Sequence, residues 1–240
     1  MLNRILKFLI VPILLVGMGI GVVIYVVENP TDSMVARMLT YDFIISSMEK
    51  HLLMVFVSML GAIAVGVPVG IMLSRPSFYY VGKVIENVVN VGQTVPSLAI
   101  LALFFTFLGL GFNTAVFALW LYSILPILRN TFAGIMSVQP EVVESAKGMG
   151  MSPWRVLSRI ELPIAYPIII AGIRTAIVIN VGTATLATFI GAGGLGDMIV
   201  TGISVRREMV TFTGAALSAL LAILLDYIIG RIEKNLVRWS

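Results

Sequence analysis

Apolar residues along the chain gather into six runs that polar segments separate. A helix needs roughly twenty apolar residues to cross the hydrocarbon core of a bilayer. Backbone groups in lipid must find their hydrogen bonds within their own segment, so runs of this length predict helices. The predicted membrane spans are residues 8–27, 52–73, 96–112, 114–134, 163–190 and 209–230.

The fold class that follows is an all-α, polytopic membrane bundle of about six transmembrane helices. Residues 1–50 are expected to form an N-terminal extra helix with an outer loop, and residues 51–240 the core of the bundle. Composition agrees, because 59% of the residues are hydrophobic and only 12% are charged. Cysteine is absent, which excludes disulfides and thiolate sites.

Basic residues fall unevenly on the two sides of the predicted spans. With the N-terminus inside, inner segments hold eleven basic residues and outer segments hold four, with Arg174 inside a span. This bias places both termini in the cytoplasm. The net charge of +4 therefore reflects topology and indicates no nucleic-acid partner. The inner set is Arg4, Lys7, Arg75, Lys83, Arg129, Lys147, Arg155, Arg159, Arg231, Lys234 and Arg238, and the outer set is Arg37, Lys50, Arg206 and Arg207.

Residues 137–163, between the fourth and fifth spans, form a polar inner loop. Pro140 suits the first turn of a helix, and Gly150 can take the left-handed conformation that ends one. Ser152 followed by Pro153 is a start signal for a second helix. We expect two short helices joined by a compact bend. Their apolar sides would carry Val142, Ala146 and Met149, and then Trp154, Leu157 and Ile160.

This loop resembles the EAA loop of ABC-importer permeases. The matching positions are Glu144, Ser145, Ala146, Gly150, Ile160, Leu162 and Pro163, with Ser145 where the family usually has alanine. In that family the loop forms coupling helices that sit in a cleft of a separate ATP-hydrolysing subunit. The alternative is an ordinary inner loop with a helical hairpin. The residues for which the resemblance implies ATPase coupling are Glu144, Ser145, Ala146, Gly150, Met151, Pro153, Arg155, Leu162 and Pro163.

The resemblance implies the permease of a type I importer in a bacterial or archaeal cytoplasmic membrane. Its partners would be two ABC ATPase subunits, a second identical or homologous permease, an extracytoplasmic substrate-binding protein and the lipid bilayer. ATP and Mg would bind the ATPase, because this chain has no Walker A sequence. No catalytic or metal-binding constellation occurs, so we expect a transport subunit without a cofactor, not an enzyme.

Residues 191–196, Gly-Ala-Gly-Gly-Leu-Gly, satisfy the spacing of the dinucleotide-binding fingerprint. They follow a predicted membrane span and not a strand, so a nucleotide site is not expected. A tight turn in an outer loop is predicted, either for close packing or at the pore mouth. The residues assigned to this outer loop are Gly191, Gly193, Gly194, Gly196 and Asp197.

Polar residues within spans are costly and mark candidate functional positions. A helix that proline interrupts is tolerated where it lines a water-filled path. The candidates for the translocation pathway are Gln93, Thr94, Pro96, Ser97, Asn180, Thr183 and Thr185. For the first four, the alternative is a hydrated inner loop. For the last three, the alternative is that their side chains bridge two helices or bond to the backbone of their own helix.

Three further features are expected to be structural. Arg174 and Asp226 would pair, or Arg174 would extend toward the membrane surface. His51 is expected at the interface near an outer span end. Small residues four apart favour helix packing at Gly17 and Gly21, Gly66 and Gly70, and Ala215 and Ala219.

Within the permease family, residues 172–176, residues 181–187 and the glycine turn look most like the osmoprotectant branch. The function implied is an ATP-driven importer for glycine betaine, carnitine or choline that works by alternating access. One alternative keeps the architecture and imports methionine, ergothioneine or another small solute. The other is a stand-alone channel or proton-coupled carrier, for which Asp226 is the only carboxylate well inside a span.

Overall fold

A computed structural model describes residues 2–236, with side chains described for residues 9–233. The terminal basic residues Arg4, Lys7, Lys234 and Arg238 lie outside the described side chains. Within this part of the chain every regular element is a helix. The elements are α1 (Leu2–Glu28), α2 (Ser33–Met38), α3 (Tyr41–Leu73), η1 (Pro76–Phe78), α4 (Tyr79–Gly92), α5 (Ser97–Leu108), α6 (Phe112–Met136), α7 (Pro140–Gly148), α8 (Pro153–Val156), η2 (Leu157–Glu161), α9 (Leu162–Ala184), η3 (Thr185–Ile190), α10 (Leu195–Ser204) and α11 (Glu208–Leu236).

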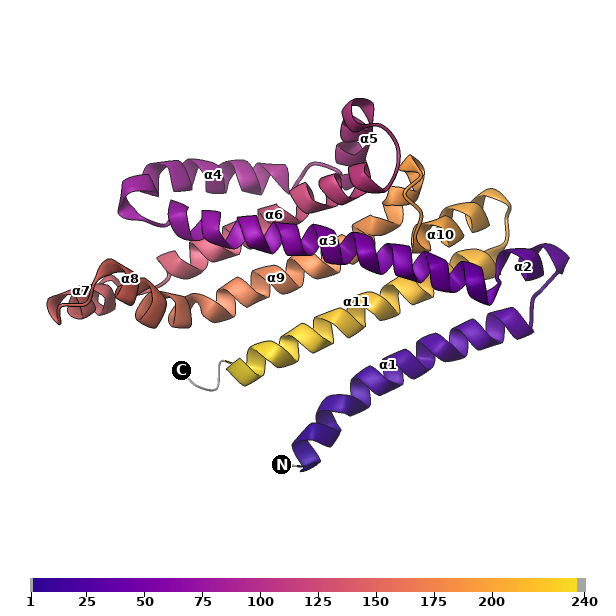
Figure 1. Cartoon of the computed structure of the whole chain (residues 1–240), viewed down its shortest axis with the longest axis horizontal. Coiled ribbons are helices and arrows are strands. Elements are labelled where there is room, and N and C mark those ends of the chain that lie inside the picture. Colours follow the sequence, from indigo (N-terminus) through magenta and orange to yellow (C-terminus); the bar gives the residue numbers. More distant parts are fainter. Residues whose placement is uncertain (1, 237–240) are drawn as a thin grey trace.

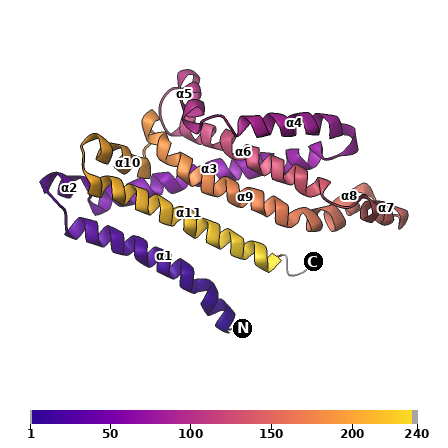
Figure 2. The ribbon, with the colours of Figure 1, turned by 180° about the vertical axis from the view of Figure 1, so that it is seen from behind.

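The long helices α3, α6, α9 and α11 form one elongated bundle (Figure 1). Helix α6 packs against both α3 and α9, and α11 packs against α9. Helix α1 lies beside α11 near α2 and diverges from the bundle toward the N-terminus in both views (Figures 1 and 2). Both termini point toward the end that carries α7 and α8, which we call the loop end. Helices α2 and α10 lie at the other end, the turn end.

Five helical segments of the described chain are long and apolar enough to cross a membrane, which agrees with the predicted bundle. Helix α3 begins earlier than the predicted second span and crosses the predicted division at residue 50 without a break. The five segments are Leu9–Glu28, Tyr41–Leu73, Phe112–Met136, Pro153–Ile190 and Glu208–Glu233.

The third predicted span, residues 96–112, contains only the short helix α5, and α4 leads into it. Helices α4 and α5 are bent by 99° relative to one another, and as one bent span they bring the total to six. The break falls at Pro96, which stands at the N-cap of α5 and disfavours a helical conformation of the residue before it. With 12 residues, α5 covers about 18 Å, which is shorter than the hydrocarbon core.

A buried polar cluster joins the three central helices. Asn180 of α9 donates from Nδ2 to Ser58 Oγ of α3 at 2.9 Å and to Ser123 Oγ of α6 at 2.6 Å. All three side chains are buried. Hydrogen bonds between helices hold them together where lipid removes the hydrophobic contribution to association.

An ion pair links α2 to the connection between α10 and α11. Asp32 caps α2 by accepting hydrogen bonds from the N–H groups of Met34 and Val35 at 2.8 and 2.9 Å. Its Oδ2 lies 2.8 Å from Nε of Arg207. The bond from Val35, with help from Met34 and Arg207, lowers the pKa of Asp32. The ionised Asp32 carboxylate therefore stabilises the folded chain at neutral pH. This stabilisation is lost as the pH falls through the lowered pKa and the carboxylate is protonated.

The contact between α3 and α6 depends on glycine. A Cβ added at Gly70 would lie 2.7 Å from Thr131 Cβ and 3.1 Å from the Leu128 carbonyl oxygen. Gly66 is similarly close to Ile127, so this predicted packing pair is confirmed. By contrast, a Cβ added at Gly17 would meet no atom within 4 Å.

We predict that Gly70→Leu separates α3 from α6 and lowers the free energy of unfolding by about 1–3 kcal/mol, because the new side chain overpacks the contact. Thermal unfolding of the detergent-purified protein measures the change. Gly17→Leu is the matched control and should unfold near the wild-type temperature. Equal unfolding temperatures for Gly70→Leu and the wild type would contradict the packing described here.

Candidate functional site

The first short helix of the loop ends as the sequence predicts. Gly150 has a φ of +81°, and its N–H donates to the Lys147 carbonyl at 2.9 Å. The N–H of Met151 donates to the Ala146 carbonyl at 3.2 Å. These two bonds form a Schellman motif, in which glycine satisfies the last carbonyls of the helix without steric cost. The bend between α7 and α8 is therefore fixed by hydrogen bonds.

The second short helix runs into α9 without a break. Pro163 has no N–H, so the regular α-helical bond to residue 159 cannot form there. The chain accommodates this by widening into a π-helical turn, η2, in which the Leu162 N–H donates to the Leu157 carbonyl. Residues 153–190 consequently form one helical segment of 38 residues.

The predicted apolar sides of the loop are only partly buried. Ala146 and Leu157 are buried, but Met149 is 75% exposed and Trp154 is 72% exposed. Met149 and Trp154 belong to the predicted apolar sides, but each stands at the tip of a short helix and does not reach the bundle. Among the other coupling candidates, Glu144, Ser145, Gly150, Pro153, Arg155 and Pro163 are exposed, and Met151 and Leu162 are partly buried.

An ion pair that the sequence analysis missed ties the loop to the rest of the bundle. Nη1 of Arg75, just after α3, lies 2.7 Å from Oε2 of Glu161 in η2. The Glu161 side chain is 11% exposed and that of Arg75 is 30% exposed. Arg75 also donates from Nε to the Ile71 carbonyl at 3.2 Å. A signal was present, because both residues lie two positions outside predicted spans on the same membrane side.

The glycine run forms the predicted tight turn at the turn end. Gly191, Gly193 and Gly194 all have positive φ. A Cβ at Gly196 would lie 1.9 Å from the Thr185 carbonyl oxygen, so only glycine permits this approach of α10 to η3. Asp197, in the first turn of α10, accepts a hydrogen bond from Thr188 Oγ1. The preceding element is helical, which is incompatible with a dinucleotide-binding unit.

His51 lies inside the bundle, so its assignment to the interface is wrong. Its ring is fully buried, and Nε2 lies 3.2 Å from the Val181 carbonyl oxygen. That carbonyl lacks its usual backbone donor, because the Thr185 N–H bonds to Gly182 and Thr183 where α9 tightens into η3. His51 thus satisfies the acceptor that the change of helix type leaves free.

The pathway candidates separate into two groups. Gln93, Thr94, Pro96 and Ser97 lie together at the bend between α4 and α5, and Gln93 Nε2 is buried without a hydrogen-bond partner among the described residues. Thr185 is partly buried and donates to its own helix at Gly182. Asn180 and Thr183 are buried, so their assignment to a pathway surface is not supported.

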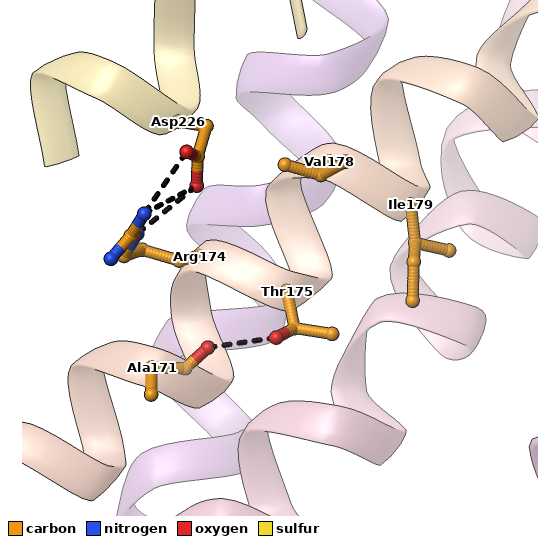
Figure 3. A pocket seen from close by; sticks show the side chains of 6 residues that line it. All are labelled: Ala171, Arg174, Thr175, Val178, Ile179 and Asp226. Carbon is orange, nitrogen blue, oxygen red and sulfur yellow. Dashed lines mark hydrogen bonds and ion pairs between the residues drawn. The ribbon is translucent and has the colours of Figure 1, made fainter. Parts of the chain in front are cut away.

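Arg174 and Asp226 do pair, between α9 and α11 (Figure 3). Arg174 donates from Nε and Nη2 to the two Asp226 oxygens, each at 3.0 Å. Its Nη1 donates to Glu233 Oε2, also at 3.0 Å. The guanidinium is therefore held between two carboxylates of α11.

Comparison with known proteins assigns this architecture. The sequence pattern of the family described as "Binding-protein-dependent transport system inner membrane component" matches residues 66–238. The chain belongs to this family. This permease is 40% identical over 238 residues to the osmoprotectant import permease protein OsmY of Salmonella typhimurium, which covers 98% of this chain and 96% of that protein. It is 45% identical over 186 residues to the glycine betaine/carnitine/choline transport system permease protein OpuCB of Bacillus subtilis. This match covers 78% of this chain and 85% of that protein.

Solved structures show the same fold. This permease superposes on a chain of the MetNI methionine ABC transporter with a TM-score of 0.73 at 21% identity, over 81% of this chain and 96% of that one. An amino acid ABC transporter chain gives a TM-score of 0.69 at 18% identity, over 85% and 99%. This permease is thus a multi-pass inner-membrane subunit of an ABC importer, a transport subunit that works with ATPase and substrate-binding partners.

We predict that Glu161→Gln lowers the free energy of unfolding by about 1–2 kcal/mol, because it leaves the partly desolvated Arg75 charge without its partner. Thermal unfolding of the purified permease measures this loss. Arg159→Gln, which removes an exposed charge of the same loop, is the control and should change little.

The exchanged pair, Arg75→Glu with Glu161→Arg, should recover part of the lost stability, since opposite charges face each other again. If the double variant loses as much free energy of unfolding as the two single variants lose together, the ion pair does not hold the loop.

Proposed function

We propose that this permease imports small quaternary-amine osmoprotectants such as glycine betaine, carnitine or choline. The observation that carries the proposal is the 42–45% identity, over 78–81% of the chain, to permeases named for glycine betaine, carnitine and choline. The permease named for osmoprotectants is 40% identical over 98% of the chain. The alternatives with the same architecture, methionine or ergothioneine import, have weaker support. The likeness to the methionine transporter rests on 21% identity, which concerns the fold alone.

The tip of the loop is the surface that we assign to the ATPase subunit. Met149 and Trp154 are large apolar side chains that are 75% and 72% exposed at this tip. Arg155 follows Trp154 directly, Glu144 stands five residues before Met149, and both are exposed as well. Exposed aromatic anchors with charged neighbours are typical of binding hot spots and their rims. ATP and Mg bind the ATPase in this proposal, and the permease carries no cofactor of its own.

The loop end faces the cytoplasm in this proposal. The excess of basic residues in the segments at this end supports the orientation. Both termini point the same way as the loop, as an even number of crossings requires. The turn end, with Gly191–Asp197 in its outer loop, then faces the capture protein.

A second permease, identical or homologous, completes the pathway, with one ATPase beneath each. The bend between α4 and α5 supports this arrangement, because α5 is too short to cross the hydrocarbon core and non-helical backbone at membrane depth needs a protein or water-lined neighbour. Gln93 lies at this bend, and its Nε2 has no hydrogen-bond partner among the described residues.

Transport follows from rigid-body movement. ATP closes the two ATPases and draws the two loops together. Each loop is joined to the 38-residue helical segment and, through Arg75, to α3. A displacement at the loop end is therefore transmitted along the helices, and the open side of the pathway switches.

We predict ATP-dependent uptake of labelled glycine betaine by vesicles that contain the permease with its ATPase and capture protein. Uptake should be absent without ATP, because the cargo moves only when the ATPases close. Labelled methionine, tested in parallel, should not enter. Methionine uptake without glycine betaine uptake would contradict the proposed cargo, and uptake without ATP would contradict the mechanism.

A further inference from the structure

The exposed face of α9 differs from the exposed face of α3. On α9, the outward positions near the middle of the helix are Ala171, Thr175, Val178, Ile179 and Gly182, most of which are small or polar. On α3, the outward positions are large and apolar. Large apolar side chains are typical of surfaces that face lipid, whereas polar groups within a span face protein or a water-filled cavity. The α3 residues are Leu53, Phe56 and Leu60, at 51%, 64% and 60% exposure.

A hollow opens on this face of α9, beside α11. Its volume is about 360 Å³, and its walls are Ala171, Arg174, Thr175, Val178, Ile179 and Asp226 (Figure 3). Arg174 bonds to Asp226, four residues before the inner end of the predicted sixth span, and to Glu233, three residues beyond that end. The hollow therefore lies in the half of the membrane nearer the loop end.

The charges at the base of this hollow are only partly covered. The Asp226 side chain is 40% exposed and that of Arg174 is 32% exposed. Three of the five guanidinium N–H groups bond to Asp226 and Glu233. Arg231 is the nearby second cation, and its Nε donates to the Tyr227 hydroxyl at 3.0 Å. Part of the Asp226 carboxylate and part of the guanidinium are therefore accessible from the hollow that both residues line.

We propose that this hollow is a cargo subsite for zwitterionic quaternary amines, an inference that rests on the proposed function. A quaternary ammonium has no N–H to donate, so it needs a negative charge beside apolar walls. Asp226 supplies the charge, and Ala171, Val178 and Ile179 supply the walls. The carboxylate of the cargo needs donors, and the Arg174 fork supplies them.

Glu233 gives this subsite a way to exchange partners without leaving Arg174 unpaired. When cargo enters, its ammonium contacts Asp226 and its carboxylate contacts the guanidinium. The bond from Nη1 to Glu233 holds the guanidinium in place meanwhile. The charge of the cargo is thus matched within the membrane, where an unmatched charge is costly.

Ala171→Leu tests the subsite, because it fills the hollow without touching the ion pair. In the vesicle assay with capture protein and ATPase, glycine betaine uptake should fall about tenfold or more, while unfolding temperature and assembly stay near wild type. Ala64→Leu, the same change at an exposed position of α3, is the control and should transport normally.

A binding measurement accompanies the uptake. Millimolar glycine betaine should raise the unfolding temperature of the wild-type permease–ATPase complex without capture protein, since a ligand stabilises the state that binds it. The rise should be absent in Ala171→Leu.

Three outcomes would overturn the subsite: uptake by Ala171→Leu near the wild-type level, loss of its assembly or stability together with uptake, or an equal temperature rise in both proteins. The second would identify this face as a packing surface. Failure of the wild type itself to import glycine betaine would instead contradict the proposed cargo.

Discussion

Inside a bilayer the backbone has no water to replace a broken helical hydrogen bond, and this constraint makes residues 153–190 a single rod. The rod begins in the loop, passes the hollow at Arg174 and ends at the glycine turn. Pro163 would interrupt a regular α-helix, but the π-helical turn η2 keeps the chain helical around it. A displacement at the loop end therefore has a continuous path to the opposite membrane surface.

Polar contacts fix this rod to its neighbours at successive depths. Arg75 and Glu161 join it to the end of α3 at the loop end, and Arg174 with Asp226 joins it to α11 further along the rod. Asn180 joins it to α3 and α6, and the buried His51 joins it to α3 near the turn end. Apolar side chains distinguish poorly between helices and lipid, so these directional contacts set the register of the rod.

The sequence determines those features that depend on local chemistry. Span number follows from the length of the apolar runs, and the bend at Gly150 and the turn at residues 191–197 follow from glycine at positions that need positive φ. Side-chain surroundings were less predictable, because they depend on how each helix is rotated about its axis. Asn180 and His51 point into the bundle for this reason, and Met149 and Trp154 point out of it.

The most direct measurement of the central claim, that an ATPase holds the loop on the cytoplasmic side, uses the absence of native cysteine. Met149→Cys gives the chain one thiol at the exposed tip of the loop. In the assembled transporter, a short bifunctional thiol reagent should link it to a cysteine placed in the helix-binding cleft of the ATPase subunit. In intact cells, a membrane-impermeant maleimide should leave it unlabelled. Labelling from outside, or no link to the ATPase, would contradict the account.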